Sequence, residues 1–179
     1  MFSFAYNFLL FFHIYSVWIL SIMAADRTGR LMQYDPSTKK VTVLLKGLAF
    51  PNGVALSKDK SFLLLTETGT LKILRLWLRR PKANTLELFS QLFGFPDNIK
   101  RNSNGEFWVA INNGGGSMSP TLLGDPVGAK FDEEGNMLEV LDGENSAAAL
   151  LKSISEVEEH NGKLWMGSVQ NSYVGVGLF

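Results

Sequence analysis

One short motif occurs twice in this chain, 45 residues apart, and it restricts the folds that the sequence can adopt. Phe50–Val54 (FPNGV) aligns with Phe95–Ile99 (FPDNI). A third, partial copy follows, because Asn161–Gly167 (NGKLWMG) resembles Asn104–Ala110 (NGEFWVA). A repeat of this length with about four short strands is the size of one blade of a β-propeller. The repeat therefore favours a propeller over a sandwich or a barrel.

From residue 29 onward the chain consists of short apolar runs separated by turn residues. The strands that we predict are Arg30–Tyr34, Val41–Leu45, Gly53–Leu56, Phe62–Thr66, Thr70–Leu78, Thr85–Phe89, Asn98–Lys100, Phe107–Asn112, Gly128–Phe131, Met137–Leu141, Ser155–Glu158, Leu164–Ser168 and Tyr173–Val176. Only Asn145–Lys152 resembles a helical turn. Strands at this spacing are typical of all-β proteins, and about thirteen of them correspond to about three blades. Closed propellers usually contain four to eight blades, so the count predicts an incomplete ring.

Residues 1–25 differ from the rest of the chain because they contain no charged side chain. As a helix rising ~1.5 Å per residue, this segment is long enough to cross a hydrocarbon core of ~30 Å. It lacks a basic n-region, and Ile22–Ala25 is a poor signal-peptidase motif, so a membrane anchor fits better than a signal peptide. We predict a hydrophobic, helical segment over 1–25 and a propeller region over 26–179. A signal peptide, a non-native start and a buried strand at Trp18–Ala25 are the alternatives.

Composition excludes several classes of function. The 17 basic and 17 acidic side chains balance, so no positive excess is present to neutralise a nucleic-acid backbone. The absence of cysteine excludes disulfides and thiolate metal sites. The two histidines are His13, in an apolar run, and His160, beside a predicted Asn-Gly hairpin. A histidine-based triad or zinc site would depend on one of these two residues.

Three tryptophans are placed by the strand pattern. Trp108 and Trp165 occupy equivalent positions in two repeats, and we expect both in the core between blades. Trp77 lies on a predicted strand with Arg75, and we expect a packed strand whose arginine extends its charged end to water.

Several ordered motifs resemble the plant strictosidine synthase-like family. They are Gly29–Pro36 (GRLMQYDP), Gly47–Ser57 (GLAFPNGVALS), Gly94–Asn102 (GFPDNIKRN) and Ser155–His160 (SEVEEH) with Gly167–Val169 (GSV). Members of that family are six-bladed propellers of about twice this length. The resemblance therefore implies that the chain corresponds to the C-terminal half, with the first three blades absent and residues 1–25 in their place. It also implies kinship with calcium-dependent hydrolases of the paraoxonase and gluconolactonase type.

The repeated motif carries oxygen ligands. In a propeller, equivalent positions on innermost strands surround the central channel, so Asn52, Asp97 and Asn98 are expected to converge there. A carboxylate with amide oxygens suits Ca²⁺, which takes six to eight oxygen ligands. In the related hydrolases, similar motifs supply axial metal ligands, so the resemblance implies a metal role for these three residues. The alternative is that Asn-Gly and Asp-Asn serve only as turn formers.

The resemblance also implies where a catalytic base should lie. Strictosidine synthase uses a glutamate to join an amine to an aldehyde, and the matching position here is Ser155, next to Glu156. Adjacent residues of a strand point to opposite faces, so Glu156 replaces that base only if a bulge re-aims it. Otherwise Glu156, Glu158 and Glu159 form a solvated acidic stretch.

Three hypotheses follow for function. The first is the condensation of alkaloid biosynthesis that the family implies, made doubtful by Ser155. The second is a calcium-dependent ester or lactone hydrolase, and both take a small-molecule substrate. The third is a non-enzymatic binding module, anchored to a membrane through residues 1–25 and self-associating through the open propeller edges. The uncharged N-terminal segment and the family resemblance indicate the secretory pathway: the endoplasmic reticulum, the vacuole or the cell exterior.

Overall fold

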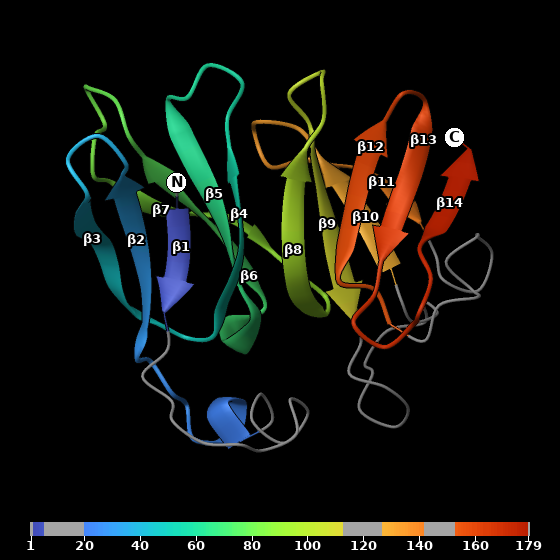
Figure 1. Cartoon of the computed structure of the whole chain (residues 1–179), viewed down its shortest axis with the longest axis horizontal. Helices are drawn as coiled ribbons and strands as arrows, with labels where there is room; N and C mark the ends of the chain where they lie inside the picture. Colours follow the sequence, from blue (N-terminus) through green and yellow to red (C-terminus); the bar gives the residue numbers. More distant parts are fainter. Residues whose placement is uncertain (1, 6–19, 113–126, 142–152, 179) are drawn as a thin grey trace.

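A computed structural model describes residues 2–5, 20–112, 127–141 and 153–178 (Figure 1). These residues form four antiparallel sheets: sheet 1 (β1–β3), sheet 2 (β4–β7), sheet 3 (β8–β11) and sheet 4 (β12–β14). The strands are β1 (Phe2–Ala5), β2 (Gly29–Asp35), β3 (Lys40–Leu48), β4 (Pro51–Leu56), β5 (Phe62–Glu67), β6 (Lys72–Trp77), β7 (Leu86–Gln91), β8 (Phe95–Arg101), β9 (Phe107–Asn112), β10 (Val127–Phe131), β11 (Met137–Leu141), β12 (Glu156–His160), β13 (Lys163–Gly167) and β14 (Gly175–Leu178). A 3₁₀ turn (Thr68–Thr70) lies between β5 and β6.

The sheets follow one another in sequence order, with sheet 1 at one end of the row and sheet 4 at the other (Figure 1). Sheets 2 and 3 each have four strands in sequence order, and their first strands, β4 and β8, contact each other. Strand β12 contacts β8 in the same way. First strands along a common axis are the arrangement of propeller blades. The all-β propeller prediction is confirmed, as two complete blades flanked by two three-stranded ones.

Alternating side chains of the central strands build the core between neighbouring sheets. In β9, Phe107 and Val109 pack toward sheet 2, whereas Trp108 and Ala110 pack toward sheet 4. Leu63 and other leucines of sheet 2 pack in turn against sheet 1. A strand buried on both faces has a continuous apolar sequence, as FLLL in β5 and FWVAI in β9 do.

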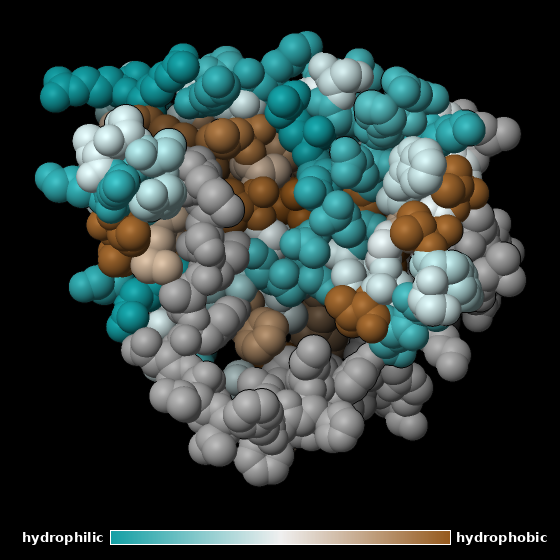
Figure 2. Space-filling view, in the orientation of Figure 1, coloured by the Kyte–Doolittle hydropathy of each residue, from teal (hydrophilic) through white to brown (hydrophobic). Residues whose placement is uncertain are grey.

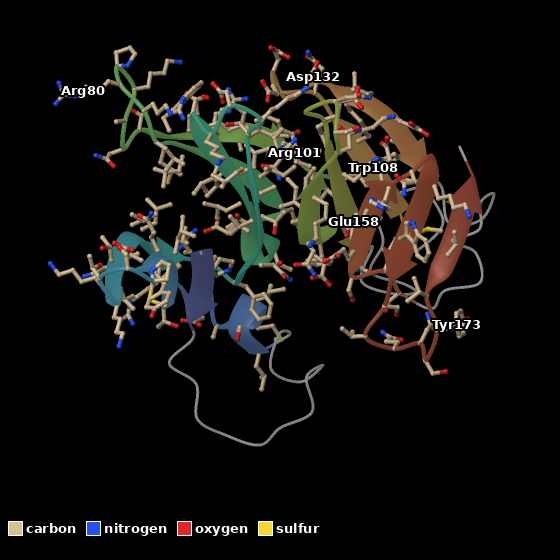
Figure 3. The ribbon with its side chains drawn as sticks, turned by 45° about the horizontal axis from the view of Figure 1, so that its top comes forward. Arg80, Arg101, Trp108, Asp132, Glu158 and Tyr173 are labelled. Carbon is tan, nitrogen blue, oxygen red and sulfur yellow. The ribbon has the colours of Figure 1, made fainter. Side chains whose placement is uncertain are left out.

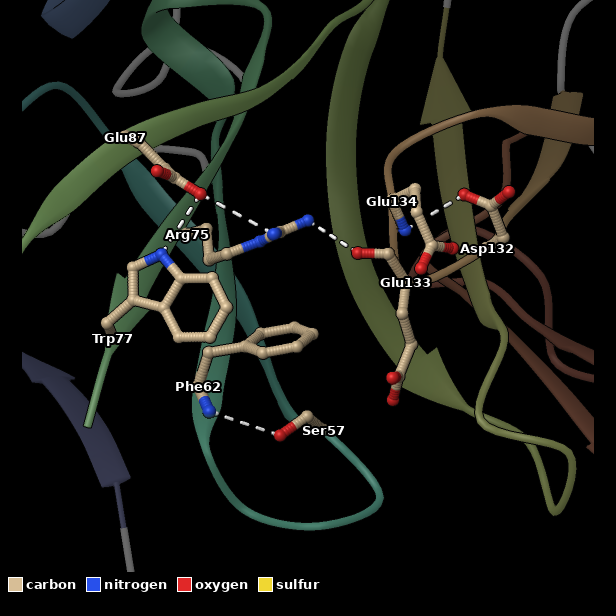
Figure 4. A network of polar contacts seen from close by, with 8 residues as sticks. All are labelled: Ser57, Phe62, Arg75, Trp77, Glu87, Asp132, Glu133 and Glu134. Atoms are coloured by element: carbon tan, nitrogen blue, oxygen red, sulfur yellow. Dashed lines mark hydrogen bonds and ion pairs between the residues drawn. The ribbon is translucent and has the colours of Figure 1, made fainter. Parts of the chain in front are cut away.

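A partly buried arginine joins the two complete blades (Figure 4). The Arg75 guanidinium lies 4.6 Å from the ring centre of Phe62 and 4.7 Å from that of Phe89. It forms an ion pair of 3.4 Å with Glu87 and donates a 2.5 Å hydrogen bond to the carbonyl of Glu133, between β10 and β11. The expected position of Arg75 on a packed strand is therefore correct, whereas the expectation that its charged end extends to water is wrong, because protein groups bind it.

Replacing this arginine tests how much the junction stabilises the fold. We expect Arg75→Lys to lower the free energy of unfolding by about 2 kcal/mol, because lysine lacks the planar fork that stacks on rings and reaches the carbonyl. Urea denaturation followed by circular dichroism measures the change. Arg80→Lys, at an exposed position, is the matched control and should leave stability unchanged. Equal stability of the Arg75 variant and the unmodified chain would contradict the role of this junction.

The described parts of the N-terminal segment include a strand as well as helical residues. Phe2–Ala5 is a strand that pairs antiparallel with β2, and helical structure is present at residues 20–23. The buried strand proposed for Trp18–Ala25 is therefore wrong over the helical residues. The pairing of β1 depends on a long-range backbone contact with β2, which local hydrophobicity does not indicate. Within the described ranges, no helix is long and apolar enough to span a bilayer.

Three other local predictions have clear outcomes. The Asn161-Gly162 hairpin is confirmed, since both residues have positive φ (51° and 69°) and join β12 to β13 directly. The single run predicted over Thr70–Leu78 is divided, because Leu71 adopts a left-handed conformation (φ 57°) after the 3₁₀ turn. The predicted helical turn at Asn145–Lys152 lies outside the described residues.

The two equivalent tryptophans have different environments. Trp108 is fully buried between sheets 3 and 4, as predicted. Trp165 is 42% exposed, so its predicted place in the core is wrong. It lies on the face of sheet 4 that no further described sheet covers.

Candidate functional site

The first residues of β4, β8 and β12 meet at one end of the axis. The backbone N–H of Asn98 donates a 3.0 Å hydrogen bond to the carbonyl of Ser155, which directly precedes β12. Thr66 of β5 links the other pair: its hydroxyl donates to the carbonyl of Asp97 (2.7 Å) and accepts from the N–H of Gly53 (2.7 Å). Three successive blades are thus connected at the point where their innermost strands begin.

Both copies of the repeated motif form irregular strand starts. The pairing of β4 with β5 shifts register within Pro51–Val54, and the pairing of β8 with β9 shifts at the equivalent place, Pro96–Ile99. A bulge takes residues out of the ladder and changes the direction of their side chains. Asn52 and Asp97 lie in these bulges. The two motifs are therefore bulged beginnings of innermost strands, and the alternative of simple tight turns does not describe them.

The Asp97 carboxylate is the centre of this cluster. Hydrogen bonding to the side chains of Asn52 and Ser155 and to the backbone of Asn98 acts to lower its pKa. Burial raises the pKa of Asp97 to about 6, and the negative charge of Glu156 adds to this increase. The three hydrogen bonds favour the charged form and oppose the shift. Asp97 is therefore an acidic group that titrates close to neutral pH.

Ser155 is the equivalent of Asn52 and Asp97 in the next blade. It lies two residues before Val157, whose pairing with Met166 matches that of Ile99 with Val109. The hydroxyl of Ser155 also accepts a 3.2 Å hydrogen bond from the N–H of Val169. Its membership of the cluster was missed in the sequence, although extending the repeat into the third blade would have indicated it. The position matched to a catalytic glutamate thus holds a hydroxyl that is bound to Asp97.

Glu156 follows Ser155 directly and is the first residue of β12. It pairs with Gly167 in the regular β12–β13 register, without the bulge that would re-aim it. Its carboxylate lies 3.3 Å from the Nζ of Lys100, and both side chains are partly exposed. His160, at the far end of β12, is exposed and contacts the side chain of Asn161 at the hairpin. Neither Glu156 nor His160 is among the groups that hydrogen bond to the Asp97 carboxylate.

Buried polar residues of sheet 2 hold the strand starts in place. Glu67, 4% exposed, accepts a 2.7 Å hydrogen bond from the N–H of Ala49 and a short one from the hydroxyl of Thr70. The hydroxyl of Thr68 donates to the carbonyl of Pro96 at 2.6 Å. These residues lie in or next to an apolar strand, so a sequence pattern gives little indication of their polar role. They fix the bulges that carry Asn52 and Asp97.

The oxygen atoms of the cluster suit a hard cation. Asp97 provides a carboxylate, Asn52 and Asn98 provide amide oxygens, and Ser155 provides a hydroxyl. Because Asp97 is partly buried and the groups that hydrogen bond to it are neutral, a cation beside it would favour its charged form. Calcium takes six to eight oxygens, so water or substrate would complete the shell. No group of three or more His, Cys, Asp or Glu residues that could hold a metal is present in the described ranges.

Comparison with known proteins identifies relatives that match most of the chain. A family model described as "Strictosidine synthase" matches residues 9–81. A strictosidine synthase-like protein of Arabidopsis thaliana is 47% identical over 89% of this chain and 49% of its own length. The strictosidine synthase of Catharanthus roseus is 40% identical over 87% of this chain and 43% of its own length.

Solved structures show the same fold at much lower identity. A gluconolactonase of Xanthomonas campestris superposes with a TM-score of 0.60 at 19% identity, over 79% of this chain and 42% of that one. A calcium-binding regucalcin of Agrobacterium tumefaciens superposes with a TM-score of 0.57 at 16% identity, over 83% of this chain and 48% of that one. The chain is similar to strictosidine synthase-like proteins and spans about half the length of the curated relatives it matches.

Proposed function

We propose that the cluster of Asn52, Asp97, Asn98 and Ser155 binds a calcium ion and that the site acts on ester or lactone bonds. The observation that carries this proposal is the partly buried Asp97 carboxylate, with a pKa of about 6 and neutral hydrogen-bonding groups from two neighbouring blades. A cation beside such a carboxylate stabilises its charged form. The structural likeness to a gluconolactonase and to a calcium-binding regucalcin supports the proposal at the level of fold.

The residues of the chain have separate parts in this chemistry. Asp97 provides the negative charge that attracts the ion, and the amides of Asn52 and Asn98 add neutral oxygens. Thr66 holds the Asp97 backbone through its 2.7 Å hydrogen bond, so that the ligands keep their spacing. A bound calcium ion polarises a carbonyl oxygen and thereby favours attack on an ester or lactone.

Amine–aldehyde condensation is the second candidate, favoured by the 40% identity to a strictosidine synthase. Its base would be Glu156, because Ser155 carries no basic group. Glu156 lies near Asp97 and raises its pKa, so it is close to the site. Its carboxylate is already engaged in a 3.3 Å ion pair with Lys100.

Activity assays distinguish the two candidates. We expect the purified chain to hydrolyse aryl esters or small lactones in the presence of Ca²⁺ and to lose at least about 100-fold in kcat/KM with a chelator. Asp97→Ala should cause a similar loss, while Glu156→Gln should retain hydrolysis. Condensation of an amine with an aldehyde that Glu156→Gln abolishes and chelator leaves intact would favour the second candidate. Hydrolysis that is indifferent to both chelator and Asp97→Ala would exclude the first.

A further inference from the structure

The turn between β12 and β13 holds an asparagine–glycine pair that takes no part in the candidate site. Asn161 and Gly162 are both exposed, and both have positive φ (51° and 69°). Figure 2 shows hydrophilic side chains along the upper edge of the molecule, where this turn lies. A Cβ placed on Gly162 would meet no atom within 4 Å, so no neighbouring element packs against the glycine. The pair is therefore open to water.

The backbone nitrogen of Gly162 is in a position to react with the side chain before it. An asparagine side chain places its Cγ within reach of the next backbone nitrogen, and glycine has no Cβ to obstruct that approach. Among the described residues, none accepts a hydrogen bond from the Gly162 N–H. The β12–β13 ladder ends with the pairing of His160 with Lys163, so both turn residues lie outside it. The nitrogen is therefore an available nucleophile.

His160 supplies the second chemical group. Its exposed ring lies beside the side-chain amide of Asn161, with 3.0 Å between Nε2 of the ring and Nδ2 of the amide. Breaking the bond from Cγ to Nδ2 requires a proton on that nitrogen, because an amide anion is a poor leaving group. A protonated imidazole at hydrogen-bond distance provides this proton, as a general acid does. The turn thus combines a nucleophile, an electrophilic carbon and an acid.

Two other Asn-Gly pairs in the described residues have protected glycine nitrogens. The Gly53 N–H, at the buried start of β4, donates a 2.7 Å hydrogen bond to the hydroxyl of Thr66. The Gly105 N–H, between β8 and β9, donates a 3.1 Å hydrogen bond to the side-chain oxygen of Asn102. A buried, hydrogen-bonded N–H reacts only after local opening of the structure, which costs free energy. A further pair, Asn113-Gly114, lies outside the described residues.

We propose that Asn161 deamidates through a cyclic imide, with the Gly162 nitrogen as nucleophile and His160 as the acid that protonates the leaving nitrogen. The Gly162 nitrogen forms a bond to Cγ of Asn161 and gives its own proton to water. The bond from Cγ to Nδ2 breaks, and the side-chain nitrogen leaves as ammonia. Water then adds to one of the two imide carbonyls and opens the ring to aspartate or isoaspartate. No group is oxidised or reduced.

The two products change the hairpin in different ways. Aspartate is compatible with the turn, because Asp-Gly favours the same tight hairpin as Asn-Gly. It adds a negative charge at the end of a strand that already carries the exposed Glu158 (Figure 3). Isoaspartate inserts a methylene group into the backbone and so lengthens the turn that joins His160 to Lys163. The modification lies at the opposite end of β12 from Ser155 and does not depend on the proposed calcium chemistry.

Incubation of the full chain, followed by digestion and mass spectrometry of the peptides, tests the proposal. We expect residue 161 to change from amide to carboxyl mass at least about 10-fold faster than Asn52 and Asn104, because those two react only through local opening. Fragmentation that cleaves the backbone beside the modified residue should identify both aspartate and isoaspartate. Conversion of Asn161 at the same rate as Asn52 or Asn104, or to aspartate without isoaspartate, would overturn the imide route.

The variant His160→Gln tests the part of the histidine. It should slow the conversion of Asn161 by about 10-fold, which is less than a general acid contributes in an enclosed active site. The rate at Asn104 in the same molecules is the matched control and should stay unchanged. Circular dichroism confirms that the variant is folded. An unchanged rate at Asn161, or an equal decrease at Asn104, would contradict the assistance by His160.

Discussion

Asp97→Asn is expected to make the calcium-free protein more stable at pH 8 and to remove its response to calcium. The pKa of Asp97 is about 6 in the folded chain and 3.8 in an ordinary environment. Between these values the folded state holds more protons than the unfolded state, so the free energy of unfolding falls as pH rises from about 4 to 6. Above pH 6 the charged carboxylate has its full destabilising effect. The asparagine variant carries no such charge.

The size of this effect follows from the shift. Each unit of pKa corresponds to about 1.4 kcal/mol, so the variant should gain on the order of 3 kcal/mol at pH 8 and nothing near pH 4. Calorimetry should show this as a rise in Tm of roughly 6 to 12 °C at pH 8. Added Ca²⁺ should raise the Tm of the unmodified chain, because a ligand that binds only the folded state stabilises it, and should leave the variant unchanged.

Asp59, an exposed aspartate, provides a control whose pKa is shifted in the opposite direction. Hydrogen bonds from Ser61 and Ser57 lower the pKa of Asp59 to about 2, so its contribution to stability is present above its ordinary pKa and is lost as pH falls. Asp59→Asn should therefore destabilise the protein at pH 8 and leave its calcium response intact. The stability of each variant is compared with that of the unmodified chain at each pH. If this difference changed with pH in the same direction for Asp97→Asn and Asp59→Asn, the environment inferred for Asp97 would be wrong.

Gly53→Ala is expected to destabilise the fold by about 3 kcal/mol or more and to disrupt the candidate site. A Cβ at this position would lie 2.5 Å from the backbone N of Ile99 and 2.7 Å from the Cα of Asn98. Both are backbone atoms of β8, so the clash is relieved only by moving one innermost strand away from the other. That movement would break the hydrogen bonds of Thr66 to Gly53 and to Asp97.

Chemical denaturation and calcium binding together measure this effect. We expect a lower urea midpoint and the loss of calcium-dependent stabilisation in the same variant. Gly167→Ala is the matched control, because it makes the same change in a strand where a Cβ would meet only the Cβ of Glu156 at 3.8 Å. It should change stability by less than about 1 kcal/mol. If the two variants were equally stable, the close approach of β4 and β8 would not be what selects glycine at residue 53.

Much of the fold and part of the candidate site are predictable because they depend on local or periodic features. The repeat of Phe50–Val54 at Phe95–Ile99 places two innermost strands in equivalent positions, and Asn161-Gly162 specifies its hairpin through backbone conformation alone. Periodicity also brings Asn52 and Asp97 to one axis. The structure adds that their side chains are hydrogen bonded to each other.

Other features depend on contacts between distant segments, and a local pattern does not contain them. The pKa of Asp97 is set by burial and by Ser155, which is 58 residues away in the chain. The difference between Trp108 and Trp165 arises because a neighbouring sheet covers one and not the other. The pairing of Phe2–Ala5 with β2 likewise depends on a backbone edge elsewhere in the chain.

The repeated Pro-Asn-Gly and Pro-Asp-Asn motifs show this division most clearly. Their sequence determines that each begins an innermost strand and carries an oxygen-bearing side chain near the axis, because spacing and residue type are properties of the chain itself. Only the tertiary structure decides that both are bulged, that Gly53 permits the close approach of β8, and that Ser155 completes the cluster. These features arise from packing between blades, where short-range repulsion and burial set positions that no single strand specifies.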